Sequence, residues 1–158
     1  MSLTAEQKTI LNNEVVNDPL LKGYSTYLPD QSGKVVELLN EVTETMIKER
    51  MITARGILSD YPGGPSSAAT VLDKLETAAP SIPALKWAFK FLTTPEGLNI
   101  GHSATQGMID FLATTTGGDI LTTTEAGHLK SLALMPASRA EVLGLPFMTT
   151  ELFLSRTE

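Results

Sequence analysis

The fold is decided by TTTEAGHLKSLALMPASRAE, residues 122–141, which contains the start signal of a helix twice. In Thr122-Thr123-Thr124-Glu125 and in Ser138-Arg139-Ala140-Glu141, a hydroxyl residue is followed by Glu three positions later. This spacing is that of the capping box, in which the hydroxyl accepts a hydrogen bond from a backbone N–H and the carboxylate accepts one from the cap. The stretch therefore predicts two helices, at residues 123–135 and 139–143.

Similar caps and breaks divide the rest of the chain into short helices. Thr4 is a good N-cap, proline starts a helix well, and the residue before a proline disfavours helical geometry. Residues 41–49 receive no definite element, although Val42, Met46 and Ile47 fit a helical spacing. The other expected helices are residues 5–16, a turn at 19–22, a segment capped by Ser32, 53–61, 68–79 capped by Ser66 or Ser67, 84–92, 103–113 capped by Ser103, and a last segment beginning near Thr149.

These segments predict an all-α fold, because no strand-like alternation exceeds four or five residues and no heptad repeat persists. We expect a single compact domain over residues 1–158, with seven to nine short helices in an irregular orthogonal bundle. The strongest break is the internal loop at residues 62–65, Pro-Gly-Gly-Pro. Four residues are too few for a linker between independent domains, so this break does not alter the expectation of one domain.

Composition bounds the class of protein. The chain has 158 residues, 42% of them hydrophobic and 19% charged, which is typical of a globular protein. It has no cysteine and no apolar run of the roughly 18 residues that span a membrane. The first residues lack the basic and apolar regions of a targeting peptide, so we expect synthesis and folding in the cytoplasm.

The charge is acidic and evenly spread along the chain. The net charge is −6, and residues 1–60 and 61–158 each contain six Lys/Arg against nine Asp/Glu. Nucleic-acid binding depends on cations that neutralise phosphates, and anionic membrane surfaces attract basic segments. The sequence therefore argues against nucleic acid and membrane as partners.

Candidate catalytic and cofactor-binding motifs have simpler explanations. His102, Ser103 and Asp110 could suggest a nucleophilic triad, but Gly101-His102-Ser103 is more typical of a helix start. Neither His102 nor His128 has a second metal ligand at helical spacing except Glu125, three residues before His128. The glycines before Ser66 lack the lysine of a phosphate-binding loop. We predict no catalytic residue, no metal and no cofactor.

Trp87 lies between Lys86 and Lys90 in the most apolar of the expected helices. An exposed indole beside two cations could stack on a base or a sugar. The spacing of the neighbouring apolar residues instead favours a core position for Trp87, with the two lysines at its solvent edge.

Six apolar residues are the hardest to assign to an amphipathic stripe, and such residues often mark interfaces. The alternative is that they fold back and close the bundle, which is the commoner position of apolar side chains. The interface candidates are Tyr24 and Tyr27 in a connector, and Leu145, Phe147, Leu152 and Phe153 near the C-terminus.

Six blocks of sequence have a characteristic order and spacing. They are KGY at residues 22–24, ITARG at 52–56, VLDKLE at 71–76, PALKWA at 83–88, GHSATQGMID at 101–110 and PASRAEVLGL at 136–145. Together they resemble a family of small, poorly characterised proteins of tailed bacteriophages and prophages. The resemblance implies a gene near the structural and tail-region genes, and no catalytic residue is carried over with it. The chain departs from the family pattern in the Thr-rich connector at residues 114–124 and in Pro146-Phe147-Met148.

Together these features predict a non-enzymatic structural or assembly protein of a tailed bacteriophage, such as a component of the virion neck or tail. Its expected partners are other phage structural proteins, including copies of itself in a symmetric assembly, and its expected location is the virion after synthesis in the host cytoplasm. The alternative is a phage effector that binds and inhibits a host or defence protein, since negative charge steers a protein toward basic surfaces. An enzyme is the third hypothesis.

Overall fold

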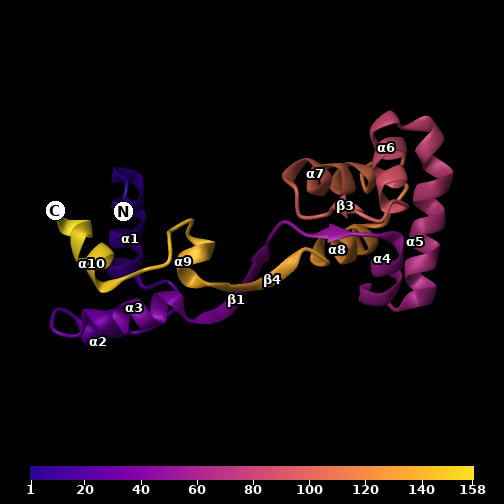
Figure 1. Cartoon of the computed structure of the whole chain (residues 1–158). Helices are drawn as coiled ribbons and strands as arrows, with labels where there is room; N and C mark the ends of the chain where they lie inside the picture. The colour runs from indigo at the N-terminus through magenta and orange to yellow at the C-terminus, as the bar shows by residue number, and fades with distance from the viewer. The chain divides into compact units, whose positions relative to one another are not determined.

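A computed structural model describes all residues, 1–158, and shows a mostly helical but mixed fold (Figure 1). Helices contain 58% of the residues and strands 9%. The helices are α1 (Ala5–Asn17), α2 (Tyr24–Tyr27), α3 (Ser32–Asn40), α4 (Ala54–Asp60), α5 (Pro65–Ala78), α6 (Pro83–Leu92), α7 (Ser103–Leu112), α8 (Thr123–Ser131), α9 (Arg139–Val142) and α10 (Thr150–Leu154), with 3₁₀ turns η1 (Ala79–Ser81) and η2 (Ser155–Thr157). The strands are β1 (Val42–Ile47), β2 (Met51–Ile52), β3 (Leu98–Asn99) and β4 (Leu134–Ser138).

The prediction of an all-α fold is wrong because two small sheets are present. β1 pairs with β4, and β2 pairs antiparallel with β3 through Met51 opposite Asn99 and Ile52 opposite Leu98. β1 has the sequence VTETMI, in which four of six residues are β-branched, a composition that favours strands.

The helix expected at residues 123–135 is also shorter than predicted. α8 ends at Ser131, and the chain continues into β4, which contains Pro136. Proline disfavours helical geometry in the residue before it, so Met135 favours the extended chain. The helix prediction followed apolar spacing and did not count this effect.

Three of the expected caps are confirmed. Thr4 caps α1, and Ser138 and Glu141 form a complete capping box at α9. Thr53 and Thr149, which stand at two expected helix starts, cap α4 and α10. Thr122 caps α8 through the N–H of Glu125. Four details differ. α5 begins already at Pro65, after Gly64 and not after Ser66 or Ser67, and the N-cap of α7 is His102 instead of Ser103. Ser32 is the first residue of α3 and does not cap it, and the expected helical turn at residues 19–22 is absent.

The chain divides into two compact units. Unit 1 consists of residues 1–46 and 136–158, and unit 2 is the continuous segment 47–135 between them. The chain passes from one unit to the other within β1 and again within β4. The expectation of a single domain did not anticipate this division. The loop expected at residues 62–65 lies inside unit 2, where residues 61–64 separate α4 from α5 and Pro65 is already the first residue of α5.

Unit 1 is built from the two ends of the chain. Its helix α3 packs against α9 and α10, and α1 packs against α2 and η2. Tyr24 and Phe153 are the largest fully buried side chains of its core. The other buried members are Leu3, Leu11, Val35, Val36, Leu39, Ala140, Leu145, Met148 and Leu152.

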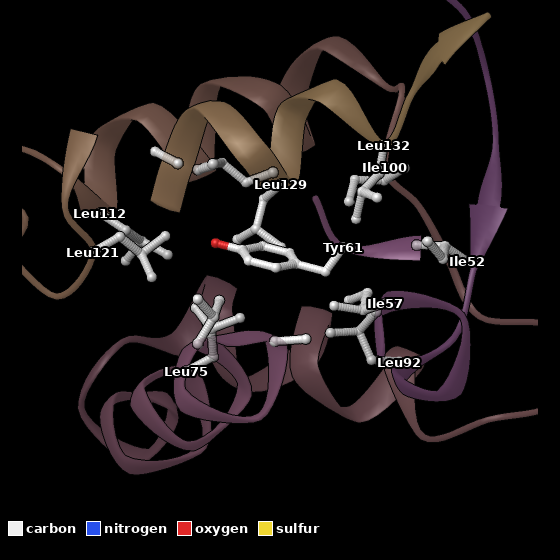
Figure 2. Close-up of a cluster of buried hydrophobic side chains, with 14 of the residues drawn as sticks. Ile52, Ile57, Tyr61, Leu75, Leu92, Ile100, Leu112, Leu121, Leu129 and Leu132 are labelled. Atoms are coloured by element: carbon white, nitrogen blue, oxygen red, sulfur yellow. The ribbon is translucent and has the colours of Figure 1, made fainter. Parts of the chain in front are cut away.

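Unit 2 has a hydrophobic core of its own. α5 packs against α4 and α6, and α7 packs against α8. The ring of Tyr61 lies in the middle of this core, among Ile57, Leu75 and Leu129 (Figure 2). No helix in either unit has the length and hydropathy required to cross a bilayer.

Candidate interaction surfaces

The six residues predicted as interface candidates have different positions in unit 1. Tyr24, Leu145, Leu152 and Phe153 are buried in its core, which corresponds to the alternative that these groups close the bundle. Tyr27 is half-buried against that core. Phe147 is different, because 77% of its surface is exposed. Two of the six, Tyr27 and Phe147, are therefore available for contact with another molecule.

Tyr27 and Phe147 line the same open groove, which we call the Phe147 groove. It has a volume of about 870 Å³ and lies between α3 and the segment at residues 147–150. Its lining is partly apolar and partly acidic. The lining residues are Tyr27, Lys34, Val36, Glu37, Leu38, Asn40, Glu41, Phe147, Met148, Thr149 and Thr150.

The position of Phe147 is determined by its neighbour Met148. The side-chain amide nitrogen of Asn40 donates to the backbone carbonyl oxygen of Met148 at 2.7 Å, and the backbone N–H of Met148 donates to the side-chain oxygen Oδ1 of Asn40 at 2.9 Å. This pair of hydrogen bonds joins the segment at residues 147–150 to the end of α3. The side chain of Met148 is buried, whereas 77% of the surface of its neighbour Phe147 is exposed, so Phe147 is directed outward.

Unit 1 also contains a buried ionic cluster that joins four segments of the chain. The guanidinium of Arg139 donates to both carboxylate oxygens of Glu14, at 2.8 and 2.9 Å, and to Oε1 of Glu44 at 3.3 Å. The hydroxyl of Tyr24 donates to Oε1 of Glu14 at 3.1 Å. The side chains of Arg139 and Glu14 are only 13% and 3% exposed. The cluster connects α1, α2, β1 and α9.

The electrostatics of this cluster favour a structural role. Burial, followed by the nearby charge of Glu14, raises the pKa of the Tyr24 hydroxyl, which therefore stays protonated and donates its hydrogen bond. The hydrogen bonds that Arg139 donates to Glu14 raise the pKa of the Arg139 guanidinium. Oε2 of Glu44 is buried without a partner. The sequence analysis missed this cluster because its members are up to 125 positions apart, and no local pattern marks such a pairing.

In unit 2, the outer side of α6 forms a second exposed surface, which we call the α6 face and define as Lys86, Trp87, Lys90 and Phe91. Trp87 is 56% and Phe91 51% exposed. The prediction that Trp87 lies in the core is wrong. The helix buries the stripe formed by Leu85, Ala88 and Leu92, and Trp87 and Phe91 lie on its other side.

The α6 face combines aromatic rings with positive charge. Trp87 and Phe91 are four residues apart, as are Lys86 and Lys90, so each pair forms a row along the helix surface. Nζ of Lys90 lies 4.9 Å from the centroid of the Trp87 ring, which is a cation–π contact. Neither lysine forms an ion pair within the chain.

The residues considered for a catalytic triad are engaged separately. Nδ1 of His102 accepts from the N–H of Ala104, Ser103 is the first residue of α7, and Asp110 forms an ion pair with Lys130 at 3.0 Å. Their contacts serve the helix start and the packing of α7 on α8.

His128 lies beside a small polar pocket of about 320 Å³ in unit 2. Its ring packs edge-on against Tyr61, with the centroids 5.3 Å apart. Glu125 is paired through Oε1 with Lys74 at 2.5 Å, and its other oxygen is buried without a partner. Burial and the charge of Glu125 raise the pKa of Tyr61, so its hydroxyl stays protonated. The Lys74–Glu125 pair joins α5 to α8.

Comparison with known proteins adds no relative to this description: no protein-family model, no curated protein and no solved structure matches the chain.

Proposed function

We propose that this protein is a non-enzymatic structural or assembly protein of a tailed bacteriophage, which acts by protein–protein contact. The observation that carries the proposal is the Phe147 groove, in which an aromatic side chain is held outward with 77% of its surface exposed. Exposed aromatic residues in a partly apolar depression are typical of interfaces, where they supply much of the binding energy. The α6 face provides a second exposed aromatic surface.

The assignment to a phage rests on the sequence blocks at residues 22–24, 52–56, 71–76, 83–88, 101–110 and 136–145. The geometry supports the kind of activity, which is contact with other proteins. The proposed location is the neck or tail of the virion, and the proposed partners are other phage structural proteins and copies of this chain.

Quantitative mass spectrometry of purified virions tests the proposal. The chain is expected in a fixed ratio to the tail proteins, in an amount that further purification leaves unchanged. A Phe147→Ser variant should be incorporated less, whereas Phe111→Ser, at an aromatic residue of unit 2 that is 43% exposed, should be incorporated normally. A chain that is absent from mature virions and from assembly intermediates would contradict the proposal.

The charge of unit 1 favours one alternative, a phage effector that binds a basic surface of a host protein. Unit 1 contains five Lys/Arg and ten Asp/Glu, a formal net charge of −5. Acidic surfaces steer a protein toward basic partners. Recovery of one stoichiometric host protein with the tagged chain, together with virions that lack the chain, would favour this alternative.

A further inference from the structure

The α6 face is a basic surface on an acidic protein. Lys86 and Lys90 have no anionic partner in the chain, and the two exposed rings beside them have no apolar cover. An unpaired cation next to an exposed aromatic surface favours a partner surface that is both acidic and partly apolar. We therefore expect the α6 face to bind a surface of this kind.

The chain itself offers such a surface in unit 1. The charge that is evenly spread along the sequence is unevenly divided in the fold, since unit 1 has a net charge of −5 and unit 2, with seven Lys/Arg and eight Asp/Glu, has −1. The Phe147 groove presents Glu37 and Glu41 beside the apolar side chains of Tyr27 and Phe147. Glu41 forms no ion pair, and Glu37 pairs only with the exposed Lys34.

We propose that the α6 face of one copy of this chain binds in the Phe147 groove of a second copy. Trp87 and Phe91 lie against Tyr27 and Phe147, and Lys86 and Lys90 pair with Glu37 and Glu41 of the second copy. This contact rests on the proposed function, for which it names one partner and one pair of surfaces.

The contact joins two different surfaces and is therefore heterologous. Two α6 faces would bring lysines together, and two Phe147 grooves would bring carboxylates together, so neither surface is complementary to itself. A heterologous contact leaves one free surface of each kind on a dimer and adds further copies until a ring closes or a filament grows. Repetition of one such contact is suited to a symmetric assembly.

A single contact of this kind is weak. One fully buried aromatic side chain covers about 150–250 Å², so the four rings of this contact bury at most about 600–1,000 Å² in total, which is below the about 1,200–2,000 Å² of a stable interface. The free chain is therefore expected to associate in a concentration-dependent way, whereas a closed ring gains from the cooperation of its contacts.

Sedimentation of the full-length chain at concentrations up to about 1 mM, the weak end of specific binding, tests the contact. Association is expected for the native chain and should weaken roughly tenfold or more in Trp87→Ser/Phe91→Ser. Phe111→Ser and Arg55→Glu, which change exposed residues of unit 2 outside the face, should associate like the native chain.

Charge reversal makes the test specific. Lys86→Glu/Lys90→Glu gives a chain with two acidic surfaces, and Glu37→Lys/Glu41→Lys gives a chain with two basic ones. Each variant alone should stay monomeric, whereas an equimolar mixture should associate again. A monomeric native chain, association that both charge variants retain, or a mixture that stays monomeric would overturn the proposal.

These outcomes are independent of the virion measurement. A chain that is present in virions but monomeric in isolation would contradict the self-contact and leave the proposed function in place. A chain that associates as described but is absent from virions and their assembly intermediates would contradict the proposed function alone.

Discussion

Arg139 holds together the buried ionic cluster of unit 1 by pairing with both Glu14 and Glu44. Its side chain forms a bidentate ion pair with a carboxylate that is 3% exposed, so its removal leaves the charge of Glu14 buried and uncompensated. Arg139→Met is expected to lower the free energy of unfolding of unit 1 by about 3–5 kcal/mol. Urea unfolding followed by the fluorescence of the tyrosines of unit 1 measures this loss.

Two variants control this prediction. Arg139→Met/Glu14→Gln removes both charges and should recover a substantial part of the loss, because no isolated ion is left in the core. Lys34→Met removes an ion pair between two exposed side chains and should leave the unfolding midpoint unchanged. Equal losses in Arg139→Met and Lys34→Met would contradict a special role for the buried cluster.

Tyr24 predicts a loss of stability at alkaline pH. Its pKa is raised above the unfolded value of 10.0 by burial and by Glu14, so the folded chain keeps this proton when the unfolded chain releases it. The stabilisation is complete below pH 10 and falls by up to about 1.4 kcal/mol for each pH unit above it. Urea midpoints at pH 8 and above pH 10 should show this fall.

A comparison of two tyrosine variants shows whether Tyr24 causes this loss of stability at alkaline pH. Tyr24→Phe should be less stable at pH 8, because it loses the hydrogen bond to Glu14, but should show a smaller further fall above pH 10. Tyr27→Phe should keep the fall of the native chain. The idea fails if Tyr24→Phe and the native chain lose stability in parallel.

Among the elements, the pairing of β2 with β3 requires glycine at position 97. Gly97 has a φ of +78°, and a Cβ there would overlap the carbonyl oxygen of Ile52 in β2. Gly97→Ala is therefore expected to destabilise unit 2 by about 1–3 kcal/mol. Gly107→Ala, on an open side of α7, is the matched control and should stabilise the helix by about 0.5–1 kcal/mol. Thermal unfolding of the two variants should shift in opposite directions.

Helix starts could be predicted from the sequence because they depend on residues a few positions apart. Thr4, Thr122 and Ser138 cap helices as expected. The strands β1 and β4 could not be predicted in this way, since they are paired across a long separation in sequence and each alone is only a short extended segment. Stabilisation of β1 comes from a partner that local periodicity does not reveal.

The candidate surfaces show the same distinction. Phe147 was predicted to be an interface candidate because it fits no helical stripe, and its side chain is exposed. Trp87 was assigned to the core because its helix is apolar nearly all round, whereas the smaller side chains of Leu85, Ala88 and Leu92 form the buried stripe. Packing against α5 and the rest of unit 2 decides which side of such a helix faces the core. The sequence of the helix alone does not contain this information.

At the scale of the whole molecule, the two cores predict separate folding of the two units. Every buried member of the core of unit 2 lies within residues 47–135, and the core of unit 1 needs both ends of the chain. In proteins generally, few contacts cross a domain boundary, and each domain has a hydrophobic core of its own. This expectation differs from the single domain that the sequence predicts, and one truncation distinguishes the two.

A chain that ends at Met135 lacks α9 and α10, and with them Arg139 and Phe153. Unit 1 of this truncated chain should unfold, because Glu14 loses its counter-charge and the core loses a fully buried aromatic ring. Hydrogen exchange measured by mass spectrometry should show rapid exchange in α1 and α3 and native protection in α5, α7 and α8. Loss of protection throughout the chain would contradict separate units and support one cooperative domain, since unit 2 would then depend on unit 1 for its stability.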